Sequence, residues 1–179
     1  RLDRLVSQNT KLSFYFVLNF IAVILASYVS FKAVIFFSIY IFGIWFYSHK
    51  LKKLPFIGNL TSAILTITPF FAIFMYYKNF ETVIFVHAIF LFLMISMREL
   101  TKDLENLKGD MVQGYITIPV AYGEKTSKIM LTVLAVLTLV PAYLLLFYFQ
   151  IGYMYFFFYL SLCLLLVFLF LLWMSQTKI

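Results

Sequence analysis

Charged residues and residues that break regular structure are scarce in this chain of 179 residues. Only 12% of the residues are charged, and there are 6 glycines, 4 prolines and one cysteine. A single cysteine excludes an intramolecular disulfide, so we expect Cys163 to pack as a small hydrophobic residue. The chain also lacks linker-like and low-complexity tracts, and no segment has the composition of a separate soluble domain. We therefore predict one domain over residues 1–179.

Apolar residues dominate what remains. Hydrophobic residues make up 64% of the chain and aromatic residues 21%, and the mean hydropathy is +1.00. A soluble domain of this length could not bury so much apolar surface. A membrane-spanning helix needs roughly 20 apolar residues, and flanking lysines and arginines extend a shorter run by reaching to the interface. The chain contains several long runs without charged residues. The last of them, residues 129–177, is too long for one span and divides at Gln150 and Gly152.

These runs predict an all-α fold, a polytopic bundle of transmembrane helices. We place six spans at roughly residues 13–31, 32–48, 57–77, 80–97, 129–149 and 153–174. A soluble helical bundle is the competing interpretation, and the apolar content argues against it.

The basic residues indicate how the chain lies in the membrane. Twelve of the 14 lysines and arginines fall in alternate connections or at the termini, and the other connections hold only Lys32 and Lys78. Because segments rich in lysine and arginine stay in the cytoplasm, we predict that the loop 98–128 is cytoplasmic and the membrane is the cell (inner) membrane. The net charge of +7 follows the span ends, which favours anionic lipids over nucleic acid as a partner. No obligatory protein partner is predicted.

The loop 98–128 is unusual because it holds ten ionisable side chains, five acidic and five basic. Four oxygen-bearing side chains in it are separated by four, three and four residues: Glu99, Asp103, Asn106 and Asp110. If the fourth span continues as a helix, all four lie in one narrow stripe, and Glu105 points to nearly the opposite side. Such oxygen ligands suit Mg²⁺. In the alternative interpretation, the acids pair with Lys102 and Lys108 in a solvated loop.

The residues around these acids resemble a known motif. The stretch KDLENLKGDMVQGYITIPVAYG, residues 102–123, is similar to the second aspartate-rich segment of the UbiA family of intramembrane prenyltransferases. That segment typically reads K-D-x-E-D-x-x-G-D, then G, then T-x-P-V and a further G. The matching positions are Lys102, Asp103, Glu105, Gly109, Asp110, Gly114, Thr117, Pro119, Val120 and Gly123. Asn106 stands where the family usually has a second aspartate, so it offers a carbonyl oxygen without charge.

Two other stretches resemble the same family. YSHKLKKLPFIGNL, residues 47–60, is similar to its Y-S-x-x-L-K-R…L-x-G-N segment, although its lysines would also be expected from the positive-inside rule alone. RLVSQN, residues 4–9, looks like the end of a stretch that follows the family's first aspartate motif. The resemblance implies that this motif lies upstream of Arg1 and that the six spans are the third to eighth of nine. The isolated chain is therefore expected to be inactive.

The resemblance also implies a function. UbiA-like enzymes move a polyprenyl group from its diphosphate to a lipid or aromatic acceptor, with Mg²⁺ as cofactor. The form REL-x-KD-x-EN-x-KGD looks most like members that prenylate geranylgeranylglyceryl phosphate, and 4-hydroxybenzoate or another quinone precursor is the next candidate. Carried over residue by residue, the catalytic residues are Asp103 and Asp110, and Asn106 joins them as a metal ligand. The implied substrate-binding residues are Tyr47, Lys50, Lys52, Lys102 and Asn106.

A polytopic transporter without prenyl transfer activity is the alternative function. Transporters carry polar or charged residues near the membrane midplane and interrupted helices in paired positions. Here the predicted spans are nearly free of charge, and His87, Pro69 and Pro141 are the features that hint at transport. The charges gather at the ends of the spans instead, which favours the enzyme.

Overall fold

The computed structural model describes residues 7–149 and 152–175, and the regular structure within them is entirely helical. In this part of the chain, six helical stretches of 21 to 31 residues are long and apolar enough to cross a membrane. A helix can do so because its backbone groups bond to one another and leave none exposed to lipid. The prediction of an all-α, six-span fold is confirmed. Gln150 and residues 1–6, which entered the predictions above, lie outside the described residues.

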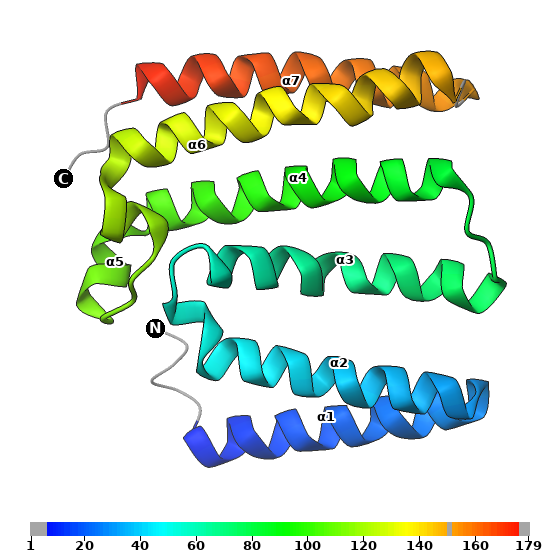
Figure 1. The fold of residues 1–179 in the computed structure, drawn as a ribbon. Coiled ribbons are helices and arrows are strands. Elements are labelled where there is room, and N and C mark those ends of the chain that lie inside the picture. The colour runs from blue at the N-terminus through cyan, green and yellow to red at the C-terminus, as the bar shows by residue number, and fades with distance from the viewer. Residues whose placement is uncertain (1–6, 150–151, 176–179) are drawn as a thin grey trace. The chain divides into compact units, whose positions relative to one another are not determined.

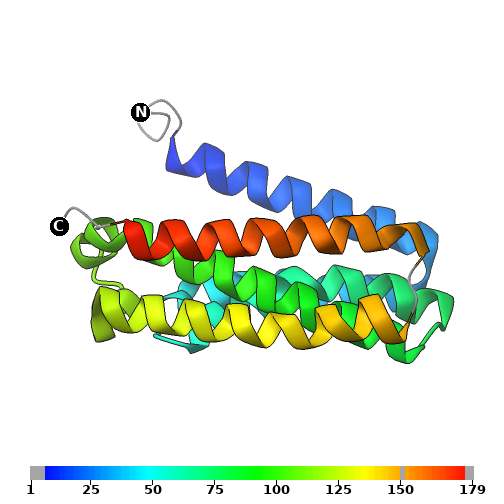
Figure 2. The same cartoon turned by 90° about the horizontal axis from the view of Figure 1, so that it is seen from above.

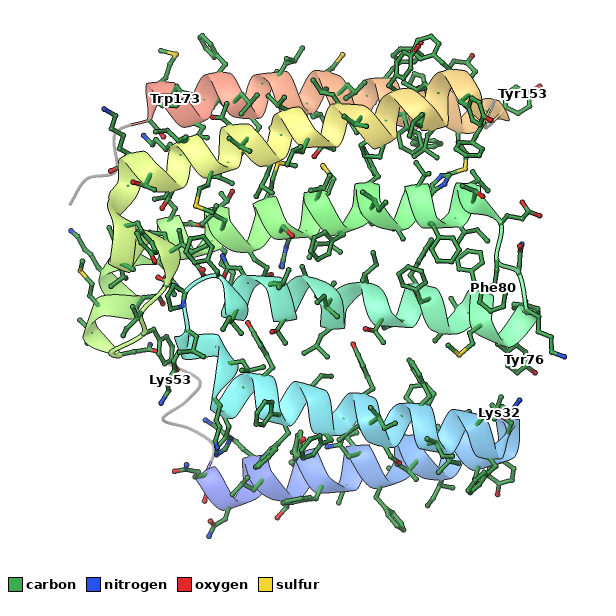
Figure 3. The ribbon with its side chains drawn as sticks, in the orientation of Figure 1. Lys32, Lys53, Tyr76, Phe80, Tyr153 and Trp173 are labelled. Atoms are coloured by element: carbon green, nitrogen blue, oxygen red, sulfur yellow. The ribbon has the colours of Figure 1, made fainter. Side chains whose placement is uncertain are left out.

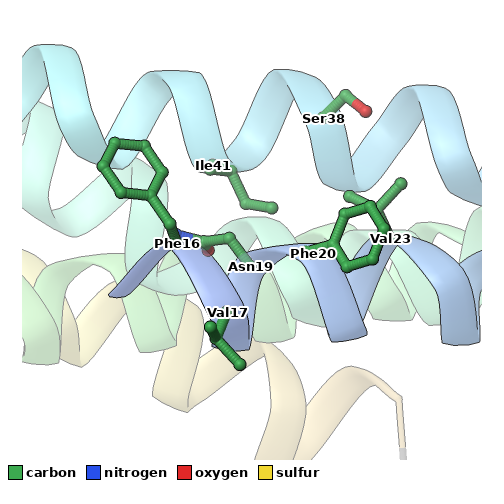
Figure 4. A pocket seen from close by; sticks show the side chains of 7 residues that line it. All are labelled: Phe16, Val17, Asn19, Phe20, Val23, Ser38 and Ile41. Atoms are coloured by element: carbon green, nitrogen blue, oxygen red, sulfur yellow. The ribbon is translucent and has the colours of Figure 1, made fainter. Parts of the chain in front are cut away.

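The chain divides into two units, which are described separately. The first, Arg1–Ser48, contains α1 (Gln8–Val29) and nearly all of α2 (Phe31–His49). Ser30 alone connects the two helices: its N–H donates to the Ala26 carbonyl, and its hydroxyl accepts the N–H of Ala33. A mostly apolar groove of about 670 Å³ runs between α1 and α2 (Figure 4).

The second unit, His49–Ile179, contains the remaining elements (Figure 1). They are the 3₁₀ turn η2 (Leu51–Lys53), α3 (Ile57–Tyr77), α4 (Thr82–Glu105), α5 (Leu107–Val112), α6 (Ile118–Tyr143), the π-helical turn η3 (Leu144–Tyr148), the 3₁₀ turn η4 (Gly152–Met154) and α7 (Tyr155–Met174). α4 packs against α3 and most extensively against α6. Figure 2 shows α6 and α7 running in opposite directions, and Figure 1 shows both on the same side of α4.

The core of this unit consists of two apolar clusters along α4. Near the α5 end, Leu100 and Leu104 of α4 pack with Leu131 of α6 and Leu172 of α7. Toward the other end, Phe90 and neighbouring residues of α4 pack against the end of α6, η3 and the start of α7. Because α4 is held on several sides, the position of its charged C-terminal end is well defined.

The segment 98–128, predicted as a loop, is largely helical. α4 runs on to Glu105, α5 follows it, and α6 begins at Ile118, with Pro119 in its first turn, where proline is tolerated. α6 is kinked at Gly123, whose φ of 82° suits glycine. Hydropathy marks where a helix leaves the hydrocarbon, and charged residues beyond that point continue the helix in water. The predicted ends therefore differ from the observed ones.

The two ends of the second unit differ in composition. Lys53 and Trp173 lie at the end that carries α5, and Tyr76, Phe80 and Tyr153 lie at the opposite end (Figure 3). Tyrosine and tryptophan favour both membrane interfaces. Lysines and arginines gather at the α5 end, whereas Lys78 lies at the other. The arrangement is that of a multi-pass membrane protein.

Candidate functional site

The end of α4 carries three acids, and two of them, Glu99 and Asp103, lie about one helical turn apart. Glu99 is buried, with 6% of its surface exposed. Arg98 Nη1 lies 2.6 Å from Glu99 Oε1, and Lys102 Nζ lies 3.4 Å from Oε2. One pairing of the alternative interpretation, between an acid of this segment and Lys102, is present, but Glu99 is buried on a helix and not in a solvated loop. Within residues 7–149 and 152–175, Asp103 and Asp110 form no such salt bridge.

The helix breaks at Asn106, which lies between α4 and α5 with φ −94° and ψ 13°. The predicted continuous stripe from Glu99 to Asp110 is therefore not formed. Asn106 is exposed to solvent. Because of this break, Asp103 and Asp110 belong to two different helices, and their carboxylates interact electrostatically.

Asp110 is buried, with 8% of its surface exposed, and its surroundings come from the segment that follows α5. The Thr117 hydroxyl donates to Asp110 Oδ2 over 3.2 Å. The Tyr115 N–H donates to the Asp110 backbone carbonyl over 2.9 Å. Thr117 is the residue before α6, and its hydroxyl makes no bond to the helix N-terminus, so it is available to the carboxylate.

Asp103 faces a different partner. Its carboxyl lies close enough to interact electrostatically with Asp110, Glu99 and Lys102, and it faces the side-chain amide of Asn59 on α3. Asp103 Oδ2 and Asn59 Nδ2 are both buried, and neither makes a hydrogen bond of good geometry with a described residue, although the two side chains are near enough to interact. An unsatisfied buried polar group costs about 1–3 kcal/mol, so this pair calls for an explanation.

The basic connection, residues 50–56 between α2 and α3, contacts the acidic segment, residues 98–128, at three points. The Ile116 N–H donates to the Lys53 carbonyl over 3.2 Å. Lys52 Nζ lies over the Tyr115 ring, 5.1 Å from its centre. The rings of Phe56 and Tyr122 are 5.4 Å apart. These contacts bring Lys52 next to the segment whose Thr117 hydroxyl bonds to Asp110.

The other predicted substrate-binding residues lie as follows. Lys50 directly precedes η2 and is exposed. Lys102 is half-exposed on α4 and bonded to Glu99. Tyr47 is in the last turn of α2, in the first unit. Their roles stay predictions.

The donor set suits a cation that is shared with a substrate. In the described part of the chain, no three His, Cys, Asp or Glu side chains come together as a metal cluster. Asp103 and Asp110 instead lie within electrostatic range of each other, and one oxygen, Oδ2 of Asp103, is buried and makes no well-formed hydrogen bond. Mg²⁺ is commonly bound by one or two carboxylates plus substrate phosphates rather than by a full protein cage. The residues present fit that mode of binding.

Comparison with known proteins shows to which family the chain belongs. The sequence model of the UbiA prenyltransferase family matches residues 2–178. The chain belongs to the UbiA prenyltransferase family. The resemblance drawn from residues 102–123 and 47–60 is thereby confirmed. No solved structure matches the chain.

Several curated relatives of this UbiA chain share the name digeranylgeranylglyceryl phosphate synthase. The protein of Methanobrevibacter smithii is 38% identical over 117 residues, which are 62% of this chain and 41% of the relative. That of Pyrococcus furiosus is 36% identical over 123 residues, 68% of this chain and 43% of the relative. That of Thermococcus sibiricus is 36% identical over 140 residues, which are 78% of this chain and 50% of the relative. The chain thus spans about half the length of the curated relatives it matches.

Three residues to which the sequence assigns no role lie near the two aspartates or their neighbours: Asn59, Tyr115 and Thr117. All three lie within the stretches that resemble the family. Asn59 is a lone amide in the apolar run after the basic connection, a signal that could have marked it. The contacts of Tyr115 and Thr117 depend on the turn after α5, which spacing does not reveal.

Proposed function

We propose that the whole protein is a membrane prenyltransferase that moves a polyprenyl group from its diphosphate to an acceptor. The approach of Asp103 and Asp110 at the charged end of an apolar helical bundle, in a chain of the UbiA family, carries the proposal. An isoprenoid tail is soluble among the helices, and a diphosphate needs cations and hydrogen-bond donors. The α5 end of the second unit offers lysine side chains and hydrogen-bond donors next to the apolar helices.

We assign the site residues by their chemistry. Asp103 and Asp110 are the proposed catalytic and metal-binding carboxylates, with the Asn106 carbonyl as a third ligand. Lys50 and Lys52 place positive charge beside the diphosphate, joined by Tyr47, Lys102 and Asn106 as substrate-binding residues. The cation–π contact with Tyr115 supports this role for Lys52, because it holds the ammonium group at the α5 end.

The reaction breaks the bond between the allylic carbon and the diphosphate oxygen, and the electron pair leaves with the diphosphate. An oxygen or carbon of the acceptor forms the new bond to the allylic carbon and gives up a proton. Bound Mg²⁺ supplies Lewis acidity and neutralises the leaving group. The lysines stabilise the charge that develops on the diphosphate, and the apolar helices exclude water from the cationic carbon.

The acceptor that we favour is a lipid like geranylgeranylglyceryl phosphate. The relatives named digeranylgeranylglyceryl phosphate synthase support this choice. 4-Hydroxybenzoate or another quinone precursor is the second candidate. The basic residues at the α5 end support a cytoplasmic position for that end in the cell (inner) membrane. The expected partners are these substrates and membrane lipids, without nucleic acid or an obligatory protein.

Asp110→Asn and Glu105→Gln provide a matched test in the full-length protein. Glu105 is exposed and faces the groove between α4 and α7, away from Asp103. With labelled prenyl diphosphate, a panel of acceptors and Mg²⁺, we expect Asp110→Asn to lower turnover about 100-fold or more. Glu105→Gln should stay near wild type. Equal loss in both variants, or solute flux in liposomes without any prenyl transfer, would overturn the proposal and favour the transporter.

A further inference from the structure

The unsatisfied pair at the α3–α4 contact is the starting point. Asn59 Nδ2 and Asp103 Oδ2 are each buried and unbonded, although the two side chains face each other. The Asn59 amide is near enough to the Asp103 carboxyl for a weak hydrogen-bonding interaction, yet the contact does not reach good hydrogen-bond geometry, so both groups keep capacity for a better bond. Asp103 is one of the two carboxylates assigned above to the reaction, and Asn59 has no role there so far.

The backbone before Asn59 is strained. Phe56 has φ 59° and ψ −55°, and the Ile57 N–H donates to the Pro55 carbonyl over 2.6 Å. This is the classic γ-turn, a rare and strained conformation. Gly58 then passes close to η2: an added Cβ would lie 3.1 Å from the Leu51 carbonyl oxygen. Strain of this kind persists only where the surrounding structure enforces it, and it clusters at functional sites.

The strained turn is anchored to the acidic segment. The Phe56 ring packs against Tyr122, and the Lys53 carbonyl accepts the N–H of Ile116. Asn59 follows this turn in the first helical turn of α3. The position of Asn59 relative to Asp103 therefore depends on the same segment that bonds to Asp110.

We propose that Asn59 is a positioning residue for Asp103. The Asn59 amide would donate a hydrogen bond to one oxygen of the Asp103 carboxylate and so leave the other oxygen available to a bound cation. The proposal rests on the proposed function and adds a residue of α3 to it. An amide suits the task because it donates a hydrogen bond without adding charge, whereas a lysine would neutralise Asp103 and an aspartate would repel it.

Cation binding without turnover tests this role. In the full-length protein in lipid nanodiscs, Mn²⁺ binding is measured by electron paramagnetic resonance in the presence of inorganic pyrophosphate. Asn59→Leu keeps the approximate volume and removes the amide, and we expect it to weaken Mn²⁺ binding about 10- to 100-fold. Thr66→Val on the same helix is the control, because the Thr66 hydroxyl bonds to the Ser62 carbonyl of its own helix. It should bind Mn²⁺ as wild type does.

A double-mutant cycle separates positioning from a general effect on folding. In an Asp103→Asn background, Asn59→Leu should cause no further loss of Mn²⁺ binding, because the group it positions is gone. An equal loss in both backgrounds, or wild-type binding in Asn59→Leu, overturns the proposal. Should Asn59→Leu fail to insert, Asn59→Ser serves in its place, with an expected loss of similar direction.

The same samples keep the two proposals apart. If wild type binds Mn²⁺ with pyrophosphate but transfers no prenyl group to any acceptor, the proposed function fails, and the role of Asn59 is still judged by Mn²⁺ binding. If wild type transfers the prenyl group and Asn59→Leu changes neither Mn²⁺ binding nor the Mg²⁺ concentration for half-maximal turnover, the function stands and the role of Asn59 is refuted.

Discussion

At the scale of single residues, the site depends on which polar groups meet across the breaks in the helices. The spacing of Asp103 and Asp110 predicts that they lie near each other, because both belong to one short stretch. Glu99 shares that spacing but is bound by Arg98 and Lys102. The sequence marks Asn59 as a lone amide in an apolar run, but it does not reveal the contact with Asp103, which depends on how α3 packs against α4.

Thr117→Val tests the support of Asp110. The buried Thr117 hydroxyl donates to Asp110 Oδ2 over 3.2 Å, and valine has nearly the same shape without the donor. We expect turnover of the full-length protein to fall about 10-fold, in line with the loss of a hydrogen bond to a charged group. Thr117→Ser keeps the hydroxyl and should retain most activity. If both variants were equally impaired, the methyl group rather than the hydroxyl would be the important feature.

At the scale of helices, hydropathy predicts the spans because the thickness of the hydrocarbon layer dictates their length. It does not predict the breaks. Asn106 ends α4 although a continuous helix fits the spacing of the acids, and Gly123 kinks α6 inside a segment that reads as loop. These breaks follow from backbone conformations and tertiary contacts. Neither the spacing of residues along a helix nor the amino-acid composition predicts them.

Lys128 holds two helices together at the α5 end. This buried lysine of α6 pairs with Glu124 over 2.7 Å and donates to the Ser175 carbonyl, at the end of α7, over 2.6 Å. A cation is favoured at a helix C-terminus. We expect Lys128→Met to destabilise the protein by about 3 kcal/mol, because it leaves polar partners unsatisfied.

The melting temperature in detergent, measured by size-exclusion chromatography of heated samples, gives this stability. Lys125→Met is the matched control, since Lys125 is exposed on the same helix, and it should melt within a degree or two of wild type. Similar melting temperatures for Lys128→Met and Lys125→Met would show that the contact between α6 and α7 does not depend on this ion pair.

At the scale of the whole molecule, the second unit shows apolar and charged groups at different places along its helices. The apolar clusters line α4 within the bundle, and the aspartates, lysines and strained turn gather at one end of the second unit. Composition alone predicts this separation, and the family motif predicts which charges belong to the site. The arrangement of Asn59, Thr117 and Tyr115 around the two aspartates emerges only in three dimensions.

The central claim is that Asp103 and Asp110 share one cation with a substrate diphosphate. An experimental structure of the full-length protein with Mn²⁺ and an unreactive prenyl diphosphate analogue tests it most directly, because anomalous scattering locates the cation. We expect an anomalous peak with an oxygen of Asp103 and an oxygen of Asp110 at about 2.1 Å, together with diphosphate oxygens. A cation bound instead by Glu99 or Glu105, or a diphosphate held far from both aspartates, would contradict the account.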